Sequence, residues 1–484
     1  MQKLNKKIFD RKNSDYQEKV LQFGSGNFLR AFVDWQIEKL NQVTDFCGSV
    51  VIAQSTDRGI VDQLNAQDGL FTVYVQGKQN NQIIKEHTVI TCVSRGINIF
   101  RDYQEYLKIA KSPYLRFIIS NTTEAGIRFE KEDLVKNQPP KTFPGKLTIL
   151  LHERFKAFKG DKEKGLIIIP CELIDRNGEV LKKIVIQYAK HWDFETEFIE
   201  WVELANKFCC SLVDRIVPGY PHDTIDAIAK ELGYIDELLV IAEPYYSWII
   251  EGPSELKEEF PFEKANLNVQ LVKDITPYQI RKVRILNGAH TAMMPVAYLY
   301  GCNTVCEAVK DTLIRKYVEE LIYKEIIPTV DLPEKETQAF ASTVLERFEN
   351  PFIQHYLTSI ALNSMSKFKT RNMPTLLEYF NKYGKLPERL VFSLSALIFY
   401  YKGKRGNETI ELVDDEDILQ LYKTLWSKYT GSENDLHYIV ESVLGYEKLW
   451  KIDLNEIPGL TELTTTFLTK IEQEGIKKAM ELIL

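Results

Sequence analysis

Three polar residues beyond the middle of the chain, Lys282, Asn287 and His290, have side chains suited to proton transfer and to hydrogen bonding with a reacting oxygen. On a helix, Asn287 and His290 share a face, and Lys282 lies one to two turns earlier. A lysine can act as general acid and base when neighbouring positive charge, here Arg281 and Arg284, or burial lowers its pKa. Asn can donate to a developing oxyanion, and His can orient a substrate hydroxyl or the lysine.

Each of these residues also has a purely structural interpretation. Lys282 could be one more solvated charge among its basic neighbours. His290 could be a histidine whose hydrogen bonds are satisfied at a helix–helix contact. Spacing alone slightly favours this structural interpretation.

A second motif, Gly24-Ser25-Gly26-Asn27-Phe28-Leu29-Arg30-Ala31, follows an apolar strand-like run and precedes a helical pattern. That context suits a dinucleotide-binding turn, in which Gly24 permits the tight turn and Gly26 lets the backbone approach a pyrophosphate. The following helix would offer unpaired N–H groups to the phosphates. Leu29 stands where a third glycine is usual, so an ordinary strand-to-helix turn carries equal weight on this motif alone.

The acidic ribose ligand of such a site is predicted at Asp57, which ends the run Gln54-Ser55-Thr56-Asp57 after the second strand. There it would bond the ribose 2′-hydroxyl and repel a 2′-phosphate, which favours NAD over NADP. Asp57 lies further along than the ~20 residues of the simple fingerprint. A surface carboxylate at a strand end is the alternative.

The elements that must position these residues fall into two regions. The first is rich in short apolar runs typical of strands buried on both faces, separated by helical patterns at Phe32 to Leu40 and Val180 to Lys190, which predicts an α/β doubly wound sheet. Beyond about Pro277 the pattern is mostly helical, so we place a domain boundary near residue 275, with domains 1–275 and 276–484. The predicted strands contain 19–23, 49–53, 115–119 and 166–169, and the predicted later helices are 309–327, 336–348, 351–363 and 463–484.

Composition excludes several classes of protein. The 484 residues carry 61 Lys+Arg and 68 Asp+Glu, a net charge of −7, which argues against nucleic-acid binding. The densest apolar run, Leu390 to Tyr401, is too short to span a bilayer, and the basic start Met1 to Lys7 is not followed by the apolar stretch of a secretory signal. Seven cysteines without a CxxC pair argue against a disulfide framework or structural zinc. These features predict a cytoplasmic protein.

The glycine turn and the Lys282/Asn287/His290 spacing together resemble the mannitol dehydrogenase family of long-chain polyol dehydrogenases. That family carries G-x-G-x-F-x-R-A and K-x4-N-x2-H motifs, and both occur here. The resemblance implies a Rossmann-type N-terminal domain, a helical C-terminal domain and an active site between them. It implies NAD as the cofactor and no metal, with Lys282 as acid/base, Asn287 as oxyanion donor and His290 as the residue that positions the reacting group.

Further segments extend the resemblance along most of the chain. It implies cofactor contacts from Gly24, Gly26, Asn27, Phe28, Asp57, Asn121 and Thr122, and substrate contact from Asp214 of Val213-Asp214-Arg215-Ile216. The closest likeness is to the branch of the family that interconverts D-tagaturonate and D-altronate. The segments that carry this last likeness are 23–32, 120–127, 169–175 and 362–368.

Departures from the polyol pattern suggest a changed substrate pocket. Leu173 replaces an Asn that assists the oxyanion in the polyol enzymes, and Ser359 stands where an Arg is usual. A uronate needs a cation for its carboxylate, and Lys367, Lys369 and Arg371 offer three, of which Arg371 could bind it bidentately. A solvated basic helix face is the alternative, above all for Lys369.

The sequence therefore predicts NADH-dependent, reversible reduction of D-tagaturonate to D-altronate by an oxidoreductase of hexuronate catabolism. Its predicted partner is a small sugar acid, with no nucleic acid or membrane; the oligomeric state stays open. The alternatives are a fructuronate reductase or a mannitol-type dehydrogenase of the same family. A non-catalytic NAD sensor is a further alternative, against which the intact Lys282/Asn287/His290 set argues. A zinc-dependent dehydrogenase lacks a plausible set of ligands.

Overall fold

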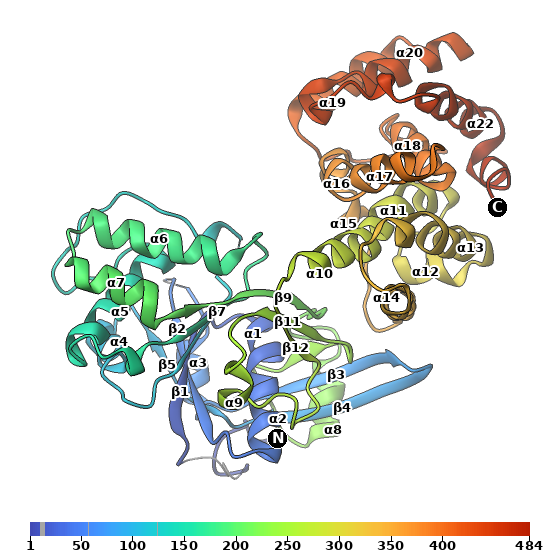
Figure 1. The fold of residues 1–484 in the computed structure, drawn as a ribbon. Coiled ribbons are helices and arrows are strands. Elements are labelled where there is room, and N and C mark those ends of the chain that lie inside the picture. The colour runs from blue at the N-terminus through green and yellow to red at the C-terminus, as the bar shows by residue number, and fades with distance from the viewer. Residues whose placement is uncertain (10–14, 57, 123) are drawn as a thin grey trace. The chain divides into compact units, whose positions relative to one another are not determined.

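The computed structural model describes residues 1–9, 15–56, 58–122 and 124–484, and it divides into two compact units. Unit 1 comprises Met1–Gly77 and Ile83–Ile275, and unit 2 comprises Lys78–Gln82 and Thr276–Leu484. Strands alternate with helices in the blue and green part of the chain, whereas the yellow to red part is almost entirely helical (Figure 1). Among the described residues, no helix is both long and apolar enough to cross a bilayer.

Unit 1 contains a parallel sheet of six strands, β1 (Gln17–Phe23), β2 (Gly48–Gln54), β5 (Val93–Asn98), β6 (Phe117–Ser120), β7 (Ile167–Pro170) and β8 (Lys207–Phe208). Their spatial order is β5-β2-β1-β6-β7-β8. Numbered by sequence within this sheet, the order is 3-2-1-4-5-6, that of a dinucleotide-binding fold. The predicted α/β sheet is confirmed, and the four predicted apolar runs lie in or overlap β1, β2, β6 and β7.

Helices cover both faces of this sheet because successive side chains of a buried strand point to opposite faces. In β1, Leu21 and Phe23 face a core shared with α4 to α7, whereas Val20 faces a second core shared with η1 and α2. The helical segments of unit 1 are α1 (Asn27–Leu29), π-helical η1 (Arg30–Asp34), α2 (Trp35–Val43), α3 (Val61–Ala66), α4 (Tyr103–Ile109), η2 (Glu124–Gly126), α5 (Phe143–Ala157), η3 (Lys162–Lys164), α6 (Asn177–His191), α7 (Thr196–Ala205), α8 (Ile225–Leu232) and α9 (Leu256–Glu259).

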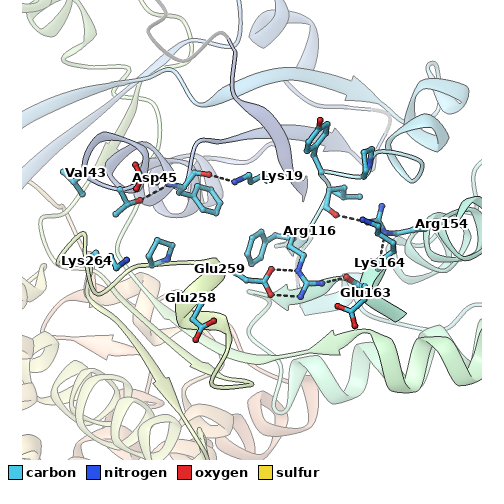
Figure 2. Close-up of a pocket in the computed structure, with 18 of the residues that line it drawn as sticks. Lys19, Val43, Asp45, Arg116, Arg154, Glu163, Lys164, Glu258, Glu259 and Lys264 are labelled. Carbon is cyan, nitrogen blue, oxygen red and sulfur yellow. Dashed lines mark hydrogen bonds and ion pairs between the residues drawn. The ribbon is translucent and has the colours of Figure 1, made fainter. Parts of the chain in front are cut away.

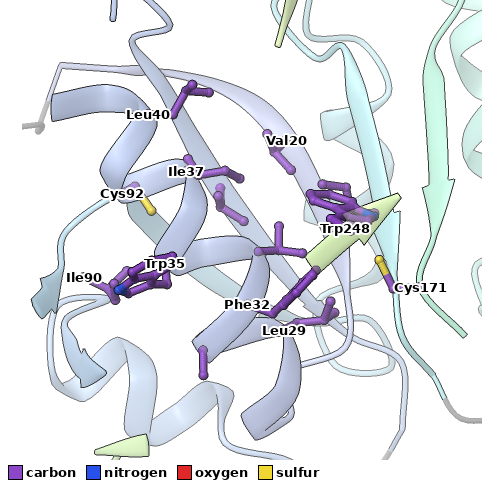
Figure 3. Packing of buried hydrophobic residues seen from close by; sticks show 14 of the residues in the cluster. Val20, Leu29, Phe32, Trp35, Ile37, Leu40, Ile90, Cys92, Cys171 and Trp248 are labelled. Carbon is purple, nitrogen blue, oxygen red and sulfur yellow. The ribbon is translucent and has the colours of Figure 1, made fainter. Parts of the chain in front are cut away.

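Figure 3 shows the second core, where Phe32 lies against Trp248 beside the helix that carries Trp35, Ile37 and Leu40. Trp248 belongs to one of two small sheets that the sequence did not predict. One has the order β10-β3-β4 and the other β12-β11-β9. Their strands are β3 (Phe71–Gln79), β4 (Gln82–Ile90), β9 (Cys210–Asp214), β10 (Val240–Ala242), β11 (Ser247–Glu251) and β12 (Val269–Val272).

From Thr276 onward unit 2 is helical, as predicted, apart from the short pair β13 (Lys404–Arg405) and β14 (Glu408–Thr409). Its buried centre is α18, the apolar run at Leu390, which packs against α11 and α22. The helical segments are α10 (Thr276–Arg281), π-helical η4 (Lys282–Gly288), α11 (Ala289–Tyr300), α12 (Val305–Lys310), α13 (Thr312–Glu320), η5 (Leu321–Ile326), η6 (Ile327–Thr329), α14 (Glu334–Phe348), α15 (Leu357–Ala361), α16 (Ser364–Arg371), α17 (Met373–Tyr383), α18 (Glu388–Tyr400), α19 (Glu416–Ser427), α20 (Glu433–Leu444), α21 (Glu447–Trp450), η7 (Leu454–Glu456) and α22 (Leu460–Met480).

Two of the predicted helices are wrong in extent. The helix predicted over 309–327 is broken at Asp311, whose side chain accepts hydrogen bonds from the N–H groups of Leu313 and Ile314 and so caps a new helix. The helix predicted over 351–363 is reduced to α15, because the side chain of Asn350 accepts from Phe352 N and Tyr356 pairs with Thr304 in a β-bridge.

Candidate functional site

The glycine turn lies at the carboxyl ends of two adjacent strands, β1 and β6, where the strand order of the sheet reverses. This switch point is where open α/β sheets bind their ligands. Gly24 has φ +121°, and a β-carbon at this position would lie 2.9 Å from the Asn121 carbonyl oxygen. Both the backbone conformation and the close approach to β6 therefore require glycine at position 24.

The turn opens a continuous helical run from Asn27 to Val43 with no side chain at its amino end to cap it. Gly26 is the exposed N-cap residue, and a β-carbon there would meet nothing within 4 Å. The helix start thus combines open space beside Gly26 with N–H groups that no side chain caps, which is the arrangement that accommodates a pyrophosphate. These backbone groups fit the dinucleotide predicted from the sequence.

The other predicted cofactor residues use side-chain atoms within the protein. Asn27 Oδ1 accepts a hydrogen bond from buried Arg30 at 2.7 Å, and Phe28 stacks on Phe32 with ring centroids 5.0 Å apart. Asn121 Nδ2 donates to the Cys171 carbonyl at 2.8 Å. These side chains stabilise the turn and the end of β6. The groups that could bind a ligand there are therefore those of the main chain.

Thr122 is held by a buried carboxylate, Glu172, whose importance the sequence did not reveal. Glu172 Oε1 accepts from Thr122 N at 2.9 Å and from its hydroxyl at 3.1 Å, and Oε2 accepts from Ser120 Oγ at 2.9 Å. Burial raises the pKa of Glu172. The signals in the sequence were its position two residues after the buried strand β7 and its place in the segment 169–175, and neither indicated these hydrogen bonds. The next residue, Leu173, is 59% exposed, an apolar side chain at the polar edge of the sheet.

Asp214 is buried at the end of β9, and the neighbouring Arg215 reaches back to the glycine-turn helix. Arg215 donates to the carbonyls of Ala31 and Glu243 at 2.6 and 3.0 Å and lies over the Trp35 ring. A π-helical segment such as η1 leaves carbonyls without their α-helical partner, and Arg215 supplies one. Contact of Asp214 with substrate remains a prediction.

In unit 2 the predicted Lys282/Asn287/His290 motif lies on one helical run, but Lys282–Gly288 is π-helical. In an α-helix, residues five apart point about 140° away from each other at 100° per residue. The i→i+5 bonding of a π-helix instead brings Lys282 and Asn287 toward one face. Both side chains are partly buried. The π-helical pitch is therefore compatible with both side chains acting on one oxygen, which stays a prediction.

The arginines beside Lys282 are paired with carboxylates, which offsets the positive charge expected to act on the lysine. Arg281 pairs with Glu336, and Arg284 pairs with Glu378 at 2.6 Å.

His290 is not the satisfied histidine of the structural interpretation. Its ring is 9% exposed and stacks on Phe348 with centroids 4.2 Å apart, yet its Nε2 has no hydrogen-bond partner among the residues that the structure describes. Burial, together with the charges of His355, Arg347 and Arg371, holds the pKa of His290 well below its usual range. The ring is therefore neutral at pH 7, and its Nε2 is buried without a hydrogen-bond partner among the described residues.

The structure places Arg371 and Lys367, on α16, close to this histidine. Arg371 Nη1 donates to Thr291 Oγ1 at 3.2 Å, and Lys367 Nζ donates to the Ile360 carbonyl at 3.0 Å. Neither has a carboxylate within ion-pair distance in the described parts of the chain. Asn372 donates to the Gly288 carbonyl at 3.0 Å and so ties α16 to the π-helical segment.

Burial is the main cause of the lowered pKa of both Lys367 and Arg371, and Arg371 adds to the effect on Lys367. A bound anion would supply an opposite charge, and this would stabilise the charged forms of both side chains. Lys369, on the same helix, is not drawn into these contacts by any interaction that the structure gives. Asp57 lies outside the described residues, so the predicted ribose contact has no structural test.

A cavity of about 800 Å³ in unit 1 lies away from these groups. It is lined by residues at or near the amino ends of β1, β6 and β7, including Lys19, Arg116 and Gly165, at the edge opposite the glycine turn. Figure 2 shows that its charges face one another, with Arg116 paired to Glu259. The cavity therefore lies at the edge of the sheet opposite the strand ends and the glycine turn, where open α/β sheets bind their ligands.

One group of potential metal ligands occurs in the described part of the chain, Glu179, Cys210 and Glu251. The Arg176 guanidinium pairs with both carboxylates, at 2.5 Å to Glu179 and 2.6 Å to Glu251. The cluster is therefore an arginine–carboxylate network.

Comparison with known proteins gives two family matches. The model described as the mannitol dehydrogenase Rossmann domain matches residues 18–264, and that described as the mannitol dehydrogenase C-terminal domain matches residues 274–472. An altronate oxidoreductase of Bacillus subtilis (strain 168) is 51% identical over 481 residues, 99% of this chain and 98% of that protein. An altronate oxidoreductase of Yersinia enterocolitica is 47% identical over 481 residues, 99% of both chains.

Solved structures share the fold. A substrate-free D-sorbitol dehydrogenase superposes with a TM-score of 0.82 at 21% identity, covering 97% of this chain and 96% of that chain. A Pseudomonas fluorescens mannitol 2-dehydrogenase, in a ternary complex with NAD and D-mannitol, superposes with a TM-score of 0.71 at 22% identity, covering 99% of each chain.

Proposed function

We propose that this chain, which belongs to the mannitol dehydrogenase family, catalyses the reversible NAD-dependent reduction of D-tagaturonate to D-altronate. The resemblance inferred from its two motifs is thus confirmed at the level of the family. Relatives of the same length that are named altronate oxidoreductase support the choice of substrate. Unit 1 would hold the cofactor and unit 2 the substrate and the acid/base group.

One observation favours a sugar acid over a neutral polyol as the substrate. It is the presence in unit 2 of two cationic side chains without an ion-pair partner. Lys367 and Arg371 are partly buried beside His290, in a chain whose net charge is −7, and no carboxylate of the described residues pairs with them. A substrate carboxylate would satisfy both, and the planar guanidinium of Arg371 can bind it through two parallel hydrogen bonds.

In this proposal the protein's residues handle the proton while bound NADH supplies the hydride. Lys282, as an ammonium group, gives its proton to the carbonyl oxygen as the new C–H bond forms, and in reverse it takes the hydroxyl proton. Asn287 donates a hydrogen bond to the same oxygen as negative charge develops on it. Neutral His290 uses its open Nε2 to orient a substrate hydroxyl.

The main chain of the glycine turn would bind the pyrophosphate, with Gly26, Asn27 and Phe28 at the helix start. We expect NAD rather than NADP, on the basis of Asp57. All seven cysteines are free thiols, which fits the reducing cytoplasm in which we place the reaction, in hexuronate breakdown.

The test is NADH oxidation with D-tagaturonate, D-fructuronate and D-fructose offered separately at equal concentration. We expect clear preference for tagaturonate. Preference for fructose would mean that Lys367 and Arg371 serve only the fold, and preference for fructuronate would move the protein to the neighbouring branch. NADH binding without turnover of any of the three would contradict catalysis itself.

A further inference from the structure

His355, for which the sequence gave no motif, is fixed against the proposed substrate site of unit 2. It lies in the loop between α14 and α15. Its carbonyl accepts from Val305 N at 2.9 Å, its N–H donates to the Ile353 carbonyl at 3.0 Å, and the next residue, Tyr356, forms the β-bridge to Thr304. The backbone that carries the ring is therefore held on both sides.

The ring of His355 contacts the ring of His290 edge to face, with centroids 4.9 Å apart and an interplanar angle of 73°. His290 is also stacked on Phe348. The open Nε2 of His290 and the ring of His355 therefore share one small region of unit 2. A substrate oriented by His290 would lie within reach of His355.

The charged groups that act on the two histidine rings are all cationic. Lys367 acts on His355, and Arg347 and Arg371 act on His290. Asp414 is a carboxylate that opposes this effect at Lys367, and it also accepts from Tyr401 and from Met365 N. Glu349, next to Phe348 in the chain, is paired with Lys78 and Arg315. Among the described residues, neither Lys367 nor Arg371 has a carboxylate within ion-pair distance, so these two positive charges lack a close counter-ion.

We infer that His355 is a third cationic member of the carboxylate subsite with Lys367 and Arg371, and that its protonated ring sets the preference for a hexuronate over a neutral sugar. The inference rests on the proposed function, because it assigns a determinant of specificity within that site. His355 would touch the carboxylate, whereas Lys282 and Asn287 touch the reacting oxygen.

A consequence follows for pH. In the empty protein, burial and Lys367 lower the pKa of His355, so the ring is neutral at pH 7. A bound carboxylate supplies the missing opposite charge and raises that pKa, so substrate binding takes up a proton. Affinity for the anionic substrate should therefore weaken as pH rises through the range in which the bound ring loses its proton.

The experiment compares wild type, His355→Asn and His355→Arg, with His437→Asn as the matched control, since His437 is an exposed histidine of α20 in the same unit. KM and kcat for D-tagaturonate and KM for NADH are measured from pH 6 to 8. We expect His355→Asn to raise KM for tagaturonate about tenfold at pH 6 and to flatten its pH dependence, with kcat and KM for NADH nearly unchanged. His355→Arg, with a permanent charge, should keep a low KM at pH 8.

Several results would overturn the inference. An unchanged KM for tagaturonate in active His355→Asn would remove the ring from the subsite. A fall in kcat at constant KM would make it a positioning residue for His290. If His355→Asn unfolds, the His355→Arg variant decides, because a pH profile parallel to that of wild type would contradict the assignment. A wild-type protein that turns over no hexuronate would overturn the proposed function and this inference together.

Discussion

The proposed cofactor site of unit 1 and the proposed substrate site of unit 2, called below the main-chain half and the side-chain half, are built in opposite ways. Around the glycine turn of unit 1, the side chains of Asn27, Asn121 and Thr122 are bonded within the protein, and the main chain is left to bind. In unit 2 the reverse holds, since the side chains of His290 and Arg371 keep unused hydrogen-bonding capacity. Backbone groups suit a cofactor whose phosphates are always the same, whereas proton transfer and selection of one sugar acid need particular side chains.

The largest effect should come from the side-chain half. Lys282→Ala should lower kcat by about 10²–10⁴-fold, the range that general acid–base catalysis supplies, because the proton donor is lost. Steady-state NADH oxidation with D-tagaturonate measures it, and Lys369→Ala on α16 is the matched control. Turnover close to wild type would show that the lysine is not the proton donor. It would also contradict the claim that side chains of unit 2 carry out the catalysis.

The main-chain half is tested by Gly24→Ala. Its φ of +121° and the 2.9 Å approach to the Asn121 carbonyl mean that a methyl group must displace the turn. We expect KM for NADH to rise about tenfold or more, with kcat at saturating NADH much less affected. Gly233→Ala is the control, since it also has a positive φ but ends α8 with nothing within 4 Å. Equal effects of both variants would mean general destabilisation.

Arg371→Gln tests the side-chain half a second time, and we expect it to have a smaller effect than Lys282→Ala. Loss of a charge-assisted hydrogen bond of about 1.5–3 kcal/mol should raise KM for tagaturonate roughly 10–100-fold, with little change in KM for NADH. Initial-rate kinetics with each substrate varied in turn measure both constants. A change confined to KM for NADH would contradict the assignment of Arg371 to the substrate site.

The smallest effect on activity should come from Asp34→Asn, beneath the turn. Burial raises the pKa of Asp34 to about 8, and Gln22 Nε2 donates to both Asp34 and the Gly24 carbonyl. Folded protein therefore keeps a proton that unfolded chain releases above about pH 4, so this carboxyl makes the fold less stable as pH rises from about 5 to 8. Urea unfolding at pH 5, 6.5 and 8 should show a shallower decline for Asp34→Asn. Parallel declines would contradict the assignment.

The sequence predicted what periodicity and local motifs determine. Apolar runs located β1, β2, β6 and β7, and the glycine turn was predicted between a strand and a helix, where the structure has it. It did not reveal the π-helical pitch at Lys282–Gly288, because no pattern of residue types distinguishes a π-helical turn from an α-helical one. The break at Asp311 could have been seen from its capping chemistry.

Contacts between segments far apart in the chain could not be predicted from the sequence. His355 meets His290 through a loop 65 residues away, and Glu172 ties the end of β7 to that of β6. Neither contact follows a spacing rule, because each depends on how whole elements pack. The basic residues of α16 illustrate the same limit. Residue type alone gave three candidates for binding the substrate carboxylate, and the tertiary contacts favour Lys367 and Arg371 among them.

The most direct test of this division of labour is calorimetric titration of NADH into Lys282→Ala and Gly24→Ala proteins beside wild type. The account predicts that Lys282→Ala, though inactive, binds NADH within about threefold of wild type, whereas Gly24→Ala binds it at least about tenfold more weakly. Loss of NADH binding in Lys282→Ala together with normal binding in Gly24→Ala would contradict it.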